Sequence, residues 1–473
     1  MSDAFTREPP WDPRRFPPAA RTPRPVQTVS MLLDPLGFTR ALRRRHGPVF
    51  SVRAFPYRGA LVCAADAATN RAVLTDHDRF TGGDAAALLA PAVGHRSLIC
   101  TPPPRHLQHR RLLLPPFHGT RIAAWARRVR RLVRARLPAL LSGDGAPVRP
   151  WAQRLTLDII LRVVFGLADP ARVAAFRHAL NAFVATGNIA VLFLPAPLRR
   201  DLGALSPGGR FHRLRAHVRD LTRDEIAARR AAPDRSHRDD VLSLLLDARD
   251  EDGAGLDDAQ LLDELTGLVL AGYETTATTI AWTLHLLAHH PGARDDLVAD
   301  LDGGSDRLLK AVVKESGRIR PAVYNAMRTA AHDTELGGRP VPCGAFVAAL
   351  FPLTHVDPEL WPAPDAFRPE RHLGTVPAPY ALTPFGGGVR RCIGVSLAQL
   401  EIETVLTEVL AAAVPEPAGP PEPARLLSVT LVPARGGRVR FRARRPHRPG
   451  TDRSAGVRTA DAATGLRWGH EQP

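Results

Sequence analysis

The sequence has few cysteines and almost no lysine. Its 473 residues include four cysteines, none of which forms a C-x-x-C pair. This excludes a zinc knuckle or redox dithiol of that type, and four cysteines in so long a chain do not make a disulfide scaffold. Such cysteine usage fits a reducing cytoplasm, where we expect the protein to reside. Among the 64 basic residues, only Lys310 and Lys314 are lysines.

The sequence also lacks a long apolar run. The N-terminal stretch MSDAFTREPPWDPRRFPPAARTPRP contains none, so we expect neither a signal peptide nor a membrane anchor. No segment reaches the roughly 18 uncharged apolar residues that suggest a transmembrane helix. We therefore expect no membrane span.

The net charge of +17 comes almost entirely from arginine. A basic face could attract an acidic partner, but a general bias toward Ala, Arg, Gly and Pro explains most of the excess. The chain has no RNA-binding, zinc-finger or basic-zipper motif, so we expect no nucleic acid partner.

The chain reads as one domain, mainly α with minor β. We expect an extended N-terminal segment at 1–28, the folded domain at 29–444 and a disordered tail at 445–473. Predicted helices cover Arg121–Leu141, Leu155–Gly166, Arg172–Thr186, Phe211–Ala231 and Asp257–His290, and predicted strands cover Val49–Val52 and Ala60–Cys63. Residues 327–353 suggest a small sheet, and 426–442 a closing hairpin that turns at Gly436-Gly437. The apolar loop Asn188–Leu198 either covers a pocket or packs in the core.

The stretch PFGGGVRRCIG, residues 384–394, is the most informative in the chain. Three consecutive glycines allow a tight turn and let a flat group approach the backbone. Cys392 follows, directly before an apolar helix. The positive end of a helix dipole lowers the pKa of a cysteine, and N–H groups of the turn can bond its sulfur. These are properties that an iron-bound thiolate needs.

Five residues of this stretch match the F-x-x-G-x-R-x-C-x-G signature of the cytochrome P450 family, and the chain resembles that family from about Gly47 to Arg442. The matching residues are Phe385, Gly388, Arg390, Cys392 and Gly394. The resemblance implies a single-domain triangular fold that holds haem b between a long central helix and the cysteine loop. It also implies that Cys392 is the iron ligand and that Phe385, Gly386 and Gly394 contact the haem.

A second motif lies in the middle of the longest predicted helix. Ala271 and Gly272 are small enough to leave room for dioxygen beside the iron, and Glu274 and Thr275 form an acid–alcohol pair. Cleavage of dioxygen consumes protons, which such a pair can deliver. The resemblance assigns this catalytic role to Glu274 and Thr275.

Further motifs concern the binding of the haem and the stability of its surroundings. Glu315 and Arg318 match E-x-x-R, and Arg371 is expected to complete a structural charge network with them. The resemblance assigns the haem propionates to His106, Arg110, Arg328 and Arg390. His109 and Arg111 are expected to be exposed, and His355 to be structural.

The substrate pocket is less well defined by the sequence. We expect Leu268, Ala271, Ala322, Val323 and Val429 to line it. Arg320 and Asn325 depart from the family pattern and suggest a more polar pocket.

The resemblance implies a bacterial monooxygenase that hydroxylates or epoxidises a small lipophilic substrate with O2. A terpenoid, polyketide or fatty-acid-like compound of secondary metabolism would fit, and we expect a monomer. No flavin or iron–sulfur motif is present, so ferredoxin and ferredoxin reductase would supply electrons, with Arg111 and Arg391 facing the acidic partner. Oxidative coupling or cyclisation without oxygen insertion, direct use of peroxide, and a haem-based sensor are alternatives.

Overall fold

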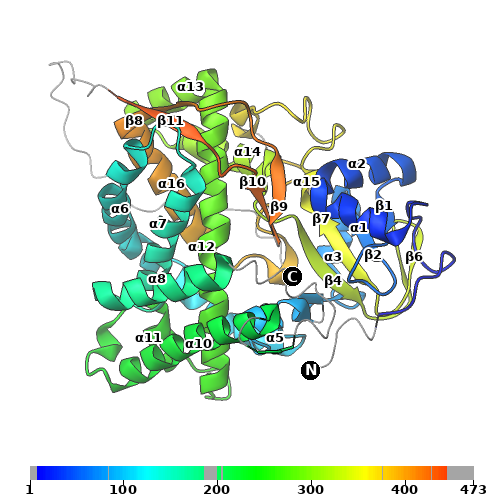
Figure 1. Cartoon of the computed structure of the whole chain (residues 1–473), viewed down its shortest axis with the longest axis horizontal. Helices are drawn as coiled ribbons and strands as arrows, with labels where there is room; N and C mark the ends of the chain where they lie inside the picture. The colour runs from blue at the N-terminus through cyan, green and yellow to red at the C-terminus, as the bar shows by residue number, and fades with distance from the viewer. Residues whose placement is uncertain are drawn as a thin grey trace.

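The computed structural model describes residues 8–444 except 84, 186–199, 204, 205, 375 and 428. The fold is mainly helical, with a smaller β part beside the helices (Figure 1). The helices are α1 (Arg24–Leu33), α2 (Pro35–His46), α3 (Ala67–Thr75), α4 (Ala90–Val93), α5 (Arg105–Leu113), α6 (Thr120–Leu141), α7 (Val148–Val164), α8 (Pro170–Ala185), α10 (Pro207–Ala231), α11 (Val241–Asp247), α12 (Asp258–His289), α13 (Pro291–Asp302), α14 (Arg307–Ile319), α15 (Phe351–Thr354) and α16 (Val395–Ala412). None of these described helices is both long and apolar enough to cross a bilayer.

The main sheet has the strand order β1-β2-β7-β4-β3. Its strands are β1 (Val49–Val52), β2 (Leu61–Ala64), β3 (Phe80–Thr81), β4 (Asn325–Ala330) and β7 (Phe346–Leu350). The β2–β7 pair is parallel and the other pairs are antiparallel. Thus the short N-terminal strands pair with strands from residues 325–350, and both sequence regions form one sheet.

Three two-stranded ladders complete the β part. They consist of β5 (Thr334–Leu336) with β6 (Arg339–Val341), β8 (Ala413–Pro417) with β11 (Val439–Ala443), and β9 (Ala424–Leu427) with β10 (Thr430–Pro433). The predicted hairpin over 426–442 is therefore wrong. The turn follows β9, and Gly436-Gly437 instead connects two separate ladders. A Cβ on Gly437 would lie 3.1 Å from the carbonyl oxygen of Ala281, so close packing on α12 accounts for this glycine.

The extended segment predicted for residues 1–28 is wrong at its C-terminal end. Helix α1 already begins at Arg24 and has Pro25 in its first turn. Nor does the segment lie entirely on the surface. Phe16 and Glu8 are buried, and the Glu8 carboxylate accepts hydrogen bonds from the backbone N–H groups of Arg58 and Gly59. Burial raises the pKa of Glu8 to about 7, although these bonds oppose the rise. The predicted tail and the whole loop Asn188–Leu198 lie outside the described residues.

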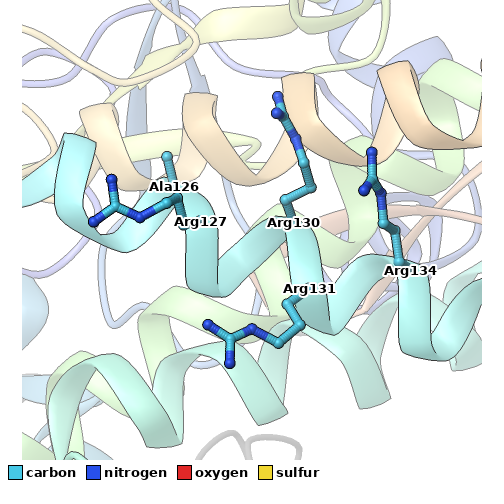
Figure 2. Close-up of a pocket in the computed structure, with 5 residues that line it drawn as sticks. All are labelled: Ala126, Arg127, Arg130, Arg131 and Arg134. Carbon is cyan, nitrogen blue, oxygen red and sulfur yellow. The ribbon is translucent and has the colours of Figure 1, made fainter.

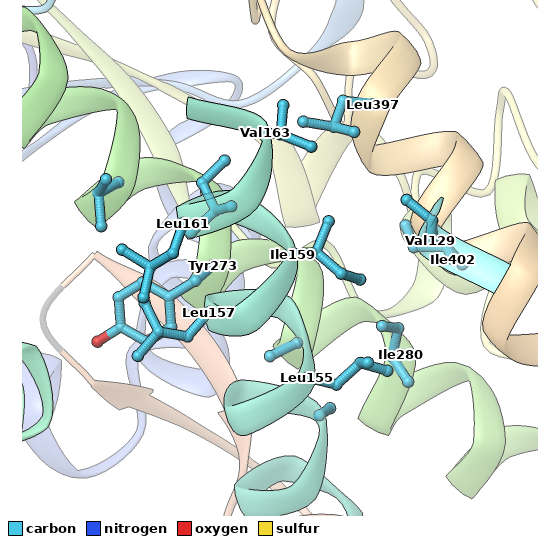
Figure 3. Close-up of a cluster of buried hydrophobic side chains, with 14 of the residues drawn as sticks. Val129, Leu155, Leu157, Ile159, Leu161, Val163, Tyr273, Ile280, Leu397 and Ile402 are labelled. Atoms are coloured by element: carbon cyan, nitrogen blue, oxygen red, sulfur yellow. The ribbon is translucent and has the colours of Figure 1, made fainter. Parts of the chain in front are cut away.

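Helix α12 is the centre of the helical part. Asp257 caps it by accepting a hydrogen bond from the N–H of Gln260 at 2.8 Å, and Pro291 begins the next helix, as the sequence predicts. Most of its side chains are buried, and α7 packs along it (Figure 3). A Cβ on Gly272 would lie 2.9 Å from Cδ1 of Ile160 on α7. Close approach of the two helices thus requires a small residue at position 272.

Candidate functional site

The loop before α16 presents Cys392. The N–H of Cys392 donates to the carbonyl of Phe385 at 3.0 Å, which closes the loop on itself. Gly388 has φ +63°, and a Cβ there would lie 2.1 Å from the carbonyl oxygen of Leu74. Gly386 also has a positive φ, of +72°. The glycines are therefore required by backbone conformation and by contact with α3.

Cys392 is exposed, although surrounding protein atoms partly desolvate its thiol. Burial raises the pKa of the thiol, while a bond from the backbone at Gly394 and the charges of Arg110 and Arg391 lower it. The net shift is upward, so the sequence-based expectation of a lowered pKa is wrong for the protein alone. The N-terminus of the helix does not outweigh desolvation.

One face of α12 stays accessible in the middle of an otherwise buried helix. Leu268, Ala271, Gly272 and Thr275 are each partly accessible or exposed, and their spacing places them on one side of the helix. The Thr275 hydroxyl donates to the carbonyl of Ala271 at 2.8 Å. This face offers small and apolar groups together with a single hydroxyl.

Glu274 points to α7. Its carboxylate accepts a hydrogen bond from Gln153 Nε2 at 2.6 Å and forms an ion pair with Arg149, whose Nε lies 3.1 Å from Oε1. The structure therefore brings Glu274 together with two residues that the sequence did not indicate. Their separation from Glu274 by more than a hundred positions left no local signal.

A basic cluster contains His106, Arg110, Arg328 and Arg390. His106 is buried, and desolvation together with the charges of the three arginines lowers its pKa to about 3. Desolvation lowers the pKa of Arg328 and of Arg390 to about 10, and it also lowers the pKa of Arg110. Cations are therefore concentrated here in a partly dehydrated environment.

These arginines have no carboxylate partner within the described part of the chain. Arg328 Nη1 donates to the carbonyl of Met327, but its buried Nε has no partner. Arg390 donates to the carbonyls of Ile99 and Thr101. A buried group of cations needs negative charge. Two haem propionates would supply it, so these residues fit the cofactor.

His109 and Arg111, both on α5, differ in their surroundings. Arg111 is exposed and pairs with Glu251 at 2.6 Å. His109, which we expected to be exposed, is instead largely buried, contacts Gln260 and lies 3.8 Å from Glu264. The ring of His109 packs against the first turns of α12, which the spacing within α5 could not indicate.

The charge network expected around Glu315 is present and fully buried at its centre. Arg318 donates to both carboxylate oxygens, at 2.8 and 2.9 Å, and Arg371 Nε lies 3.1 Å from Oε1. The sequence missed His372, whose Nε2 is 2.8 Å from Oε2. Burial opposes ionisation, but the bonds from Arg318 and His372 prevail and lower the pKa of Glu315 to about 2.

His355 contributes to the structure, as expected. It is fully buried, and its Nε2 accepts a hydrogen bond from the N–H of Thr383 at 2.9 Å. Its carbonyl accepts from Arg318 at 2.7 Å. Desolvation lowers the pKa of its ring to about 3, so the ring stays neutral and connects the charge network to the segment before the cysteine loop.

The structure brings together the predicted pocket segments 322–323 and 429. Val323 bridges to Thr430, and the carbonyl of Val429 accepts from the N–H of Tyr324 at 3.3 Å. Ala322 is partly accessible, and Val429 is 41% exposed. Leu268, on α12, contributes from another element.

Two residues that depart from the family pattern occupy different places. Arg320 lies over the ring of Trp282 and lines a separate cavity of about 100 Å³ with Asp365 and Glu422. Asn325 is in β4, paired with Leu350. Arg320 is thus explained by contacts with the last part of α12.

Four of the arginines of α6 line an open groove of about 270 Å³ (Figure 2). Arg130 and Arg134 extend to α16, where both pair with Glu408. Arg127 and Arg131 are exposed. Arg130 and Arg134 therefore connect α6 to α16 through ion pairs, whereas Arg127 and Arg131 remain on the surface.

Comparison with known proteins agrees with this geometry. Residues 29–413 match the family model for cytochrome P450. The chain belongs to the cytochrome P450 family. The fold and the cysteine loop thus belong to a haem-dependent monooxygenase, which binds a substrate and uses O2 and redox partners.

Relatives and solved structures cover nearly all of this P450. It is 35% identical to cytochrome P450 135B1 of Mycobacterium tuberculosis over 91% of this chain and 92% of that one. It is 37% identical to cytochrome P450 137 of the same species, covering 86% of both. Retinoic acid bound cyanobacterial CYP120A1 has a TM-score of 0.79 at 23% identity, covering 91% of this chain and 99% of that one. The cytochrome P450DA heme domain has a TM-score of 0.76 at 25% identity, covering 91% and 98%.

Proposed function

We propose that this P450 binds haem b through Cys392 and inserts one oxygen atom of O2 into a small lipophilic substrate, by hydroxylation or epoxidation. The observation that carries the proposal is the exposed Cys392, which lies near a cluster of cations that have no carboxylate partner among the described residues. When bound, haem with a thiolate ligand supplies the activation of dioxygen. The chain supplies orientation, protons and exclusion of water.

We assign the binding of the haem to residues from four parts of the chain. Cys392 would bind the haem iron through its sulfur, while His106, Arg110, Arg328 and Arg390 would hold the propionates. The loop residues Phe385, Gly386 and Gly394 would pack against the ring, with Ala271 and Gly272 on α12. In this arrangement the arginines, which the described part of the chain leaves without a carboxylate partner, would pair with the propionates.

We assign proton delivery to Glu274 and Thr275. The Thr275 hydroxyl would exchange its bond to the Ala271 carbonyl for a bond to water in the site, because it already lies on the accessible face of α12. Glu274 is only partly buried and can pass protons from solvent once its pairing with Arg149 loosens. Both residues would supply protons that the reaction with dioxygen consumes.

The proposed substrate is lipophilic because the expected lining is apolar. Leu268, Ala271, Ala322, Val323 and Val429 have no charged group. Such a lining suits a terpenoid, polyketide or fatty-acid-like compound of bacterial secondary metabolism. We further propose a cytoplasmic monomer that receives electrons from ferredoxin and ferredoxin reductase. Arg391, whose charge acts on Cys392 and Arg110, would meet the acidic donor.

The test begins with the carbon monoxide spectrum of the reduced protein. The wild type should show the red-shifted Soret band of thiolate ligation, and Cys392→Ser should lose it. A normal band in Cys392→Ser, or none in the wild type, would overturn the assignment of the ligand. Turnover under labelled dioxygen, with ferredoxin and reductase supplied, should then place label in the product. An unlabelled coupled or cyclised product would show that the enzyme does not insert oxygen, and steady absence of turnover would favour a sensor.

A further inference from the structure

Helix α1 exposes an apolar face to the outside. All five of its exposed residues are apolar, namely Pro25, Val26, Val29, Leu32 and Leu33. Val29 is 51% exposed and Leu33 79% exposed. A surface helix ordinarily turns its apolar stripe to the core and its polar side to water. In α1 this arrangement is reversed.

The polar side of α1 is fixed to the protein by hydrogen bonds. Gln27 is fully buried, donates to the carbonyls of Ala20 and Thr22 and accepts from the N–H of Arg53 at 2.8 Å. The hydroxyl of Thr28 accepts from the N–H of Phe55 at 3.0 Å. Rotating α1 to bury its apolar face would break these bonds, so the outward face is part of the fold.

Further apolar surface adjoins α1. Phe55, whose N–H binds Thr28, is 56% exposed, and the guanidinium of Arg24 lies 4.3 Å from its ring centroid. Figure 1 shows α1 and α2 together on the outer side of the main sheet. We call the outward residues of α1 together with Phe55 the α1 patch. Contiguous apolar surface of this kind marks a site of interaction.

The sequence around the α1 patch is strongly basic. Between residues 13 and 65 the only acidic residue is Asp34, whereas the arginines are Arg14, Arg15, Arg21, Arg24, Arg40, Arg43, Arg44, Arg45, Arg53 and Arg58. Arg21, Arg44 and Arg45 are exposed, and no carboxylate in the described part of the chain pairs with them. A partner that is apolar inside and negative at its surface would complement this region.

We propose that the α1 patch docks on the surface of an anionic lipid bilayer. The apolar side chains would enter the boundary between head groups and acyl chains, and the arginines would lie among phosphate groups. The ten residues of α1 lie along the surface and do not span it. Docking of this kind is independent of the haem chemistry.

The experiment uses the full-length holoprotein and vesicle flotation. Vesicles of phosphatidylcholine alone are compared with vesicles that also contain phosphatidylglycerol. The test variant is Val29→Glu with Leu33→Glu. The matched control is Val376→Glu with Leu373→Glu, which makes the same two changes at other exposed positions, with Val376 91% and Leu373 37% exposed.

The wild type and the control should float with phosphatidylglycerol vesicles, and the test variant should partition at least about tenfold less. All three should keep the same carbon monoxide spectrum, since the haem site is untouched. Any of three results would overturn the proposal. The first is no flotation of the wild type, and the second is equal loss in test and control variants. The third is concentration-dependent dimerisation by ultracentrifugation that only the test variant abolishes, which would assign the patch to a second copy.

Discussion

Arg149 holds the carboxylate of Glu274, with its Nε 3.1 Å from Oε1, across the contact between α7 and α12. Thr275, the next residue, instead donates its hydroxyl to the carbonyl of Ala271. The Glu274 carboxylate and the Thr275 hydroxyl of the proposed relay thus have different hydrogen-bond partners and do not bond to each other in these interactions. A proton can pass between them only after Glu274 leaves Arg149 and Gln153.

Glu274→Gln removes the acid while keeping a similar shape. We expect turnover to fall by about 100-fold, because general acid catalysis typically contributes that much or more. The solvent isotope effect on turnover should rise, and substrate binding should be unchanged by spectral titration. Gln153→Ala removes only a partner of the carboxylate and should change turnover by less than about threefold. Equal effects of both substitutions would contradict proton delivery by Glu274.

Thr275→Val keeps the branched shape and removes the hydroxyl. We expect oxygen consumption to continue while product formation falls about tenfold and peroxide accumulates, since protons reach the oxygen less effectively. Thr279→Val is the matched control. Its hydroxyl makes the same kind of bond, to the carbonyl of Thr275 at 3.0 Å, one turn further along α12. Peroxide release that is equal in both variants would assign the effect to the helix and not to the Thr275 hydroxyl.

Arg328→Ala tests the binding of the propionates. Loss of a charge-assisted hydrogen bond of about 1.5–3 kcal/mol should speed haem transfer to apomyoglobin by roughly 10- to 100-fold. Arg111→Ala removes an arginine that is 70% exposed and pairs with Glu251, so it should leave the transfer rate nearly unchanged. A rate for Arg328→Ala that matches the wild type would remove Arg328 from the propionate site.

The network around Glu315 should contribute stability that depends on pH. The folded pKa of Glu315 is about 2, below its ordinary value of 4.5. Its contribution is therefore complete above pH 4.5 and is lost as pH falls toward 2. Glu315→Gln should lower the free energy of unfolding by about 3–5 kcal/mol at neutral pH, because it leaves buried cations unpaired.

Urea unfolding at several pH values measures this difference. The difference in the free energy of unfolding between the wild type and Glu315→Gln should become smaller as the pH falls below about 4.5. Glu370→Gln is the control, because Glu370 pairs with Arg368 on the surface, where both side chains are more than half exposed. That pair should contribute less than about 1 kcal/mol. If this difference in the free energy of unfolding does not depend on pH, the result would contradict the ionised state of Glu315.

Local sequence determined several elements of this P450. The limits of α12 follow from Asp257 and Pro291, which act on their immediate neighbours. The cysteine loop follows from glycines that permit positive φ, as at Gly388. Motif spacing also relates Glu315, Arg318 and Arg371, which form one network in the structure. In each case the signal lies within a short segment or within a family pattern.

Contacts between distant segments were decided only by the tertiary structure. The partners of Glu274, the pairing of β11 with β8, and His372 beside Glu315 all join residues that no local pattern relates. The pKa of Cys392 depends on how much protein surrounds the thiol. Helix α1 is the clearest case. The sequence predicts an extended segment up to residue 28, and only the structure shows the helix. Hydrogen bonds of Gln27 and Thr28 to residues outside the helix then decide that its apolar residues face outward.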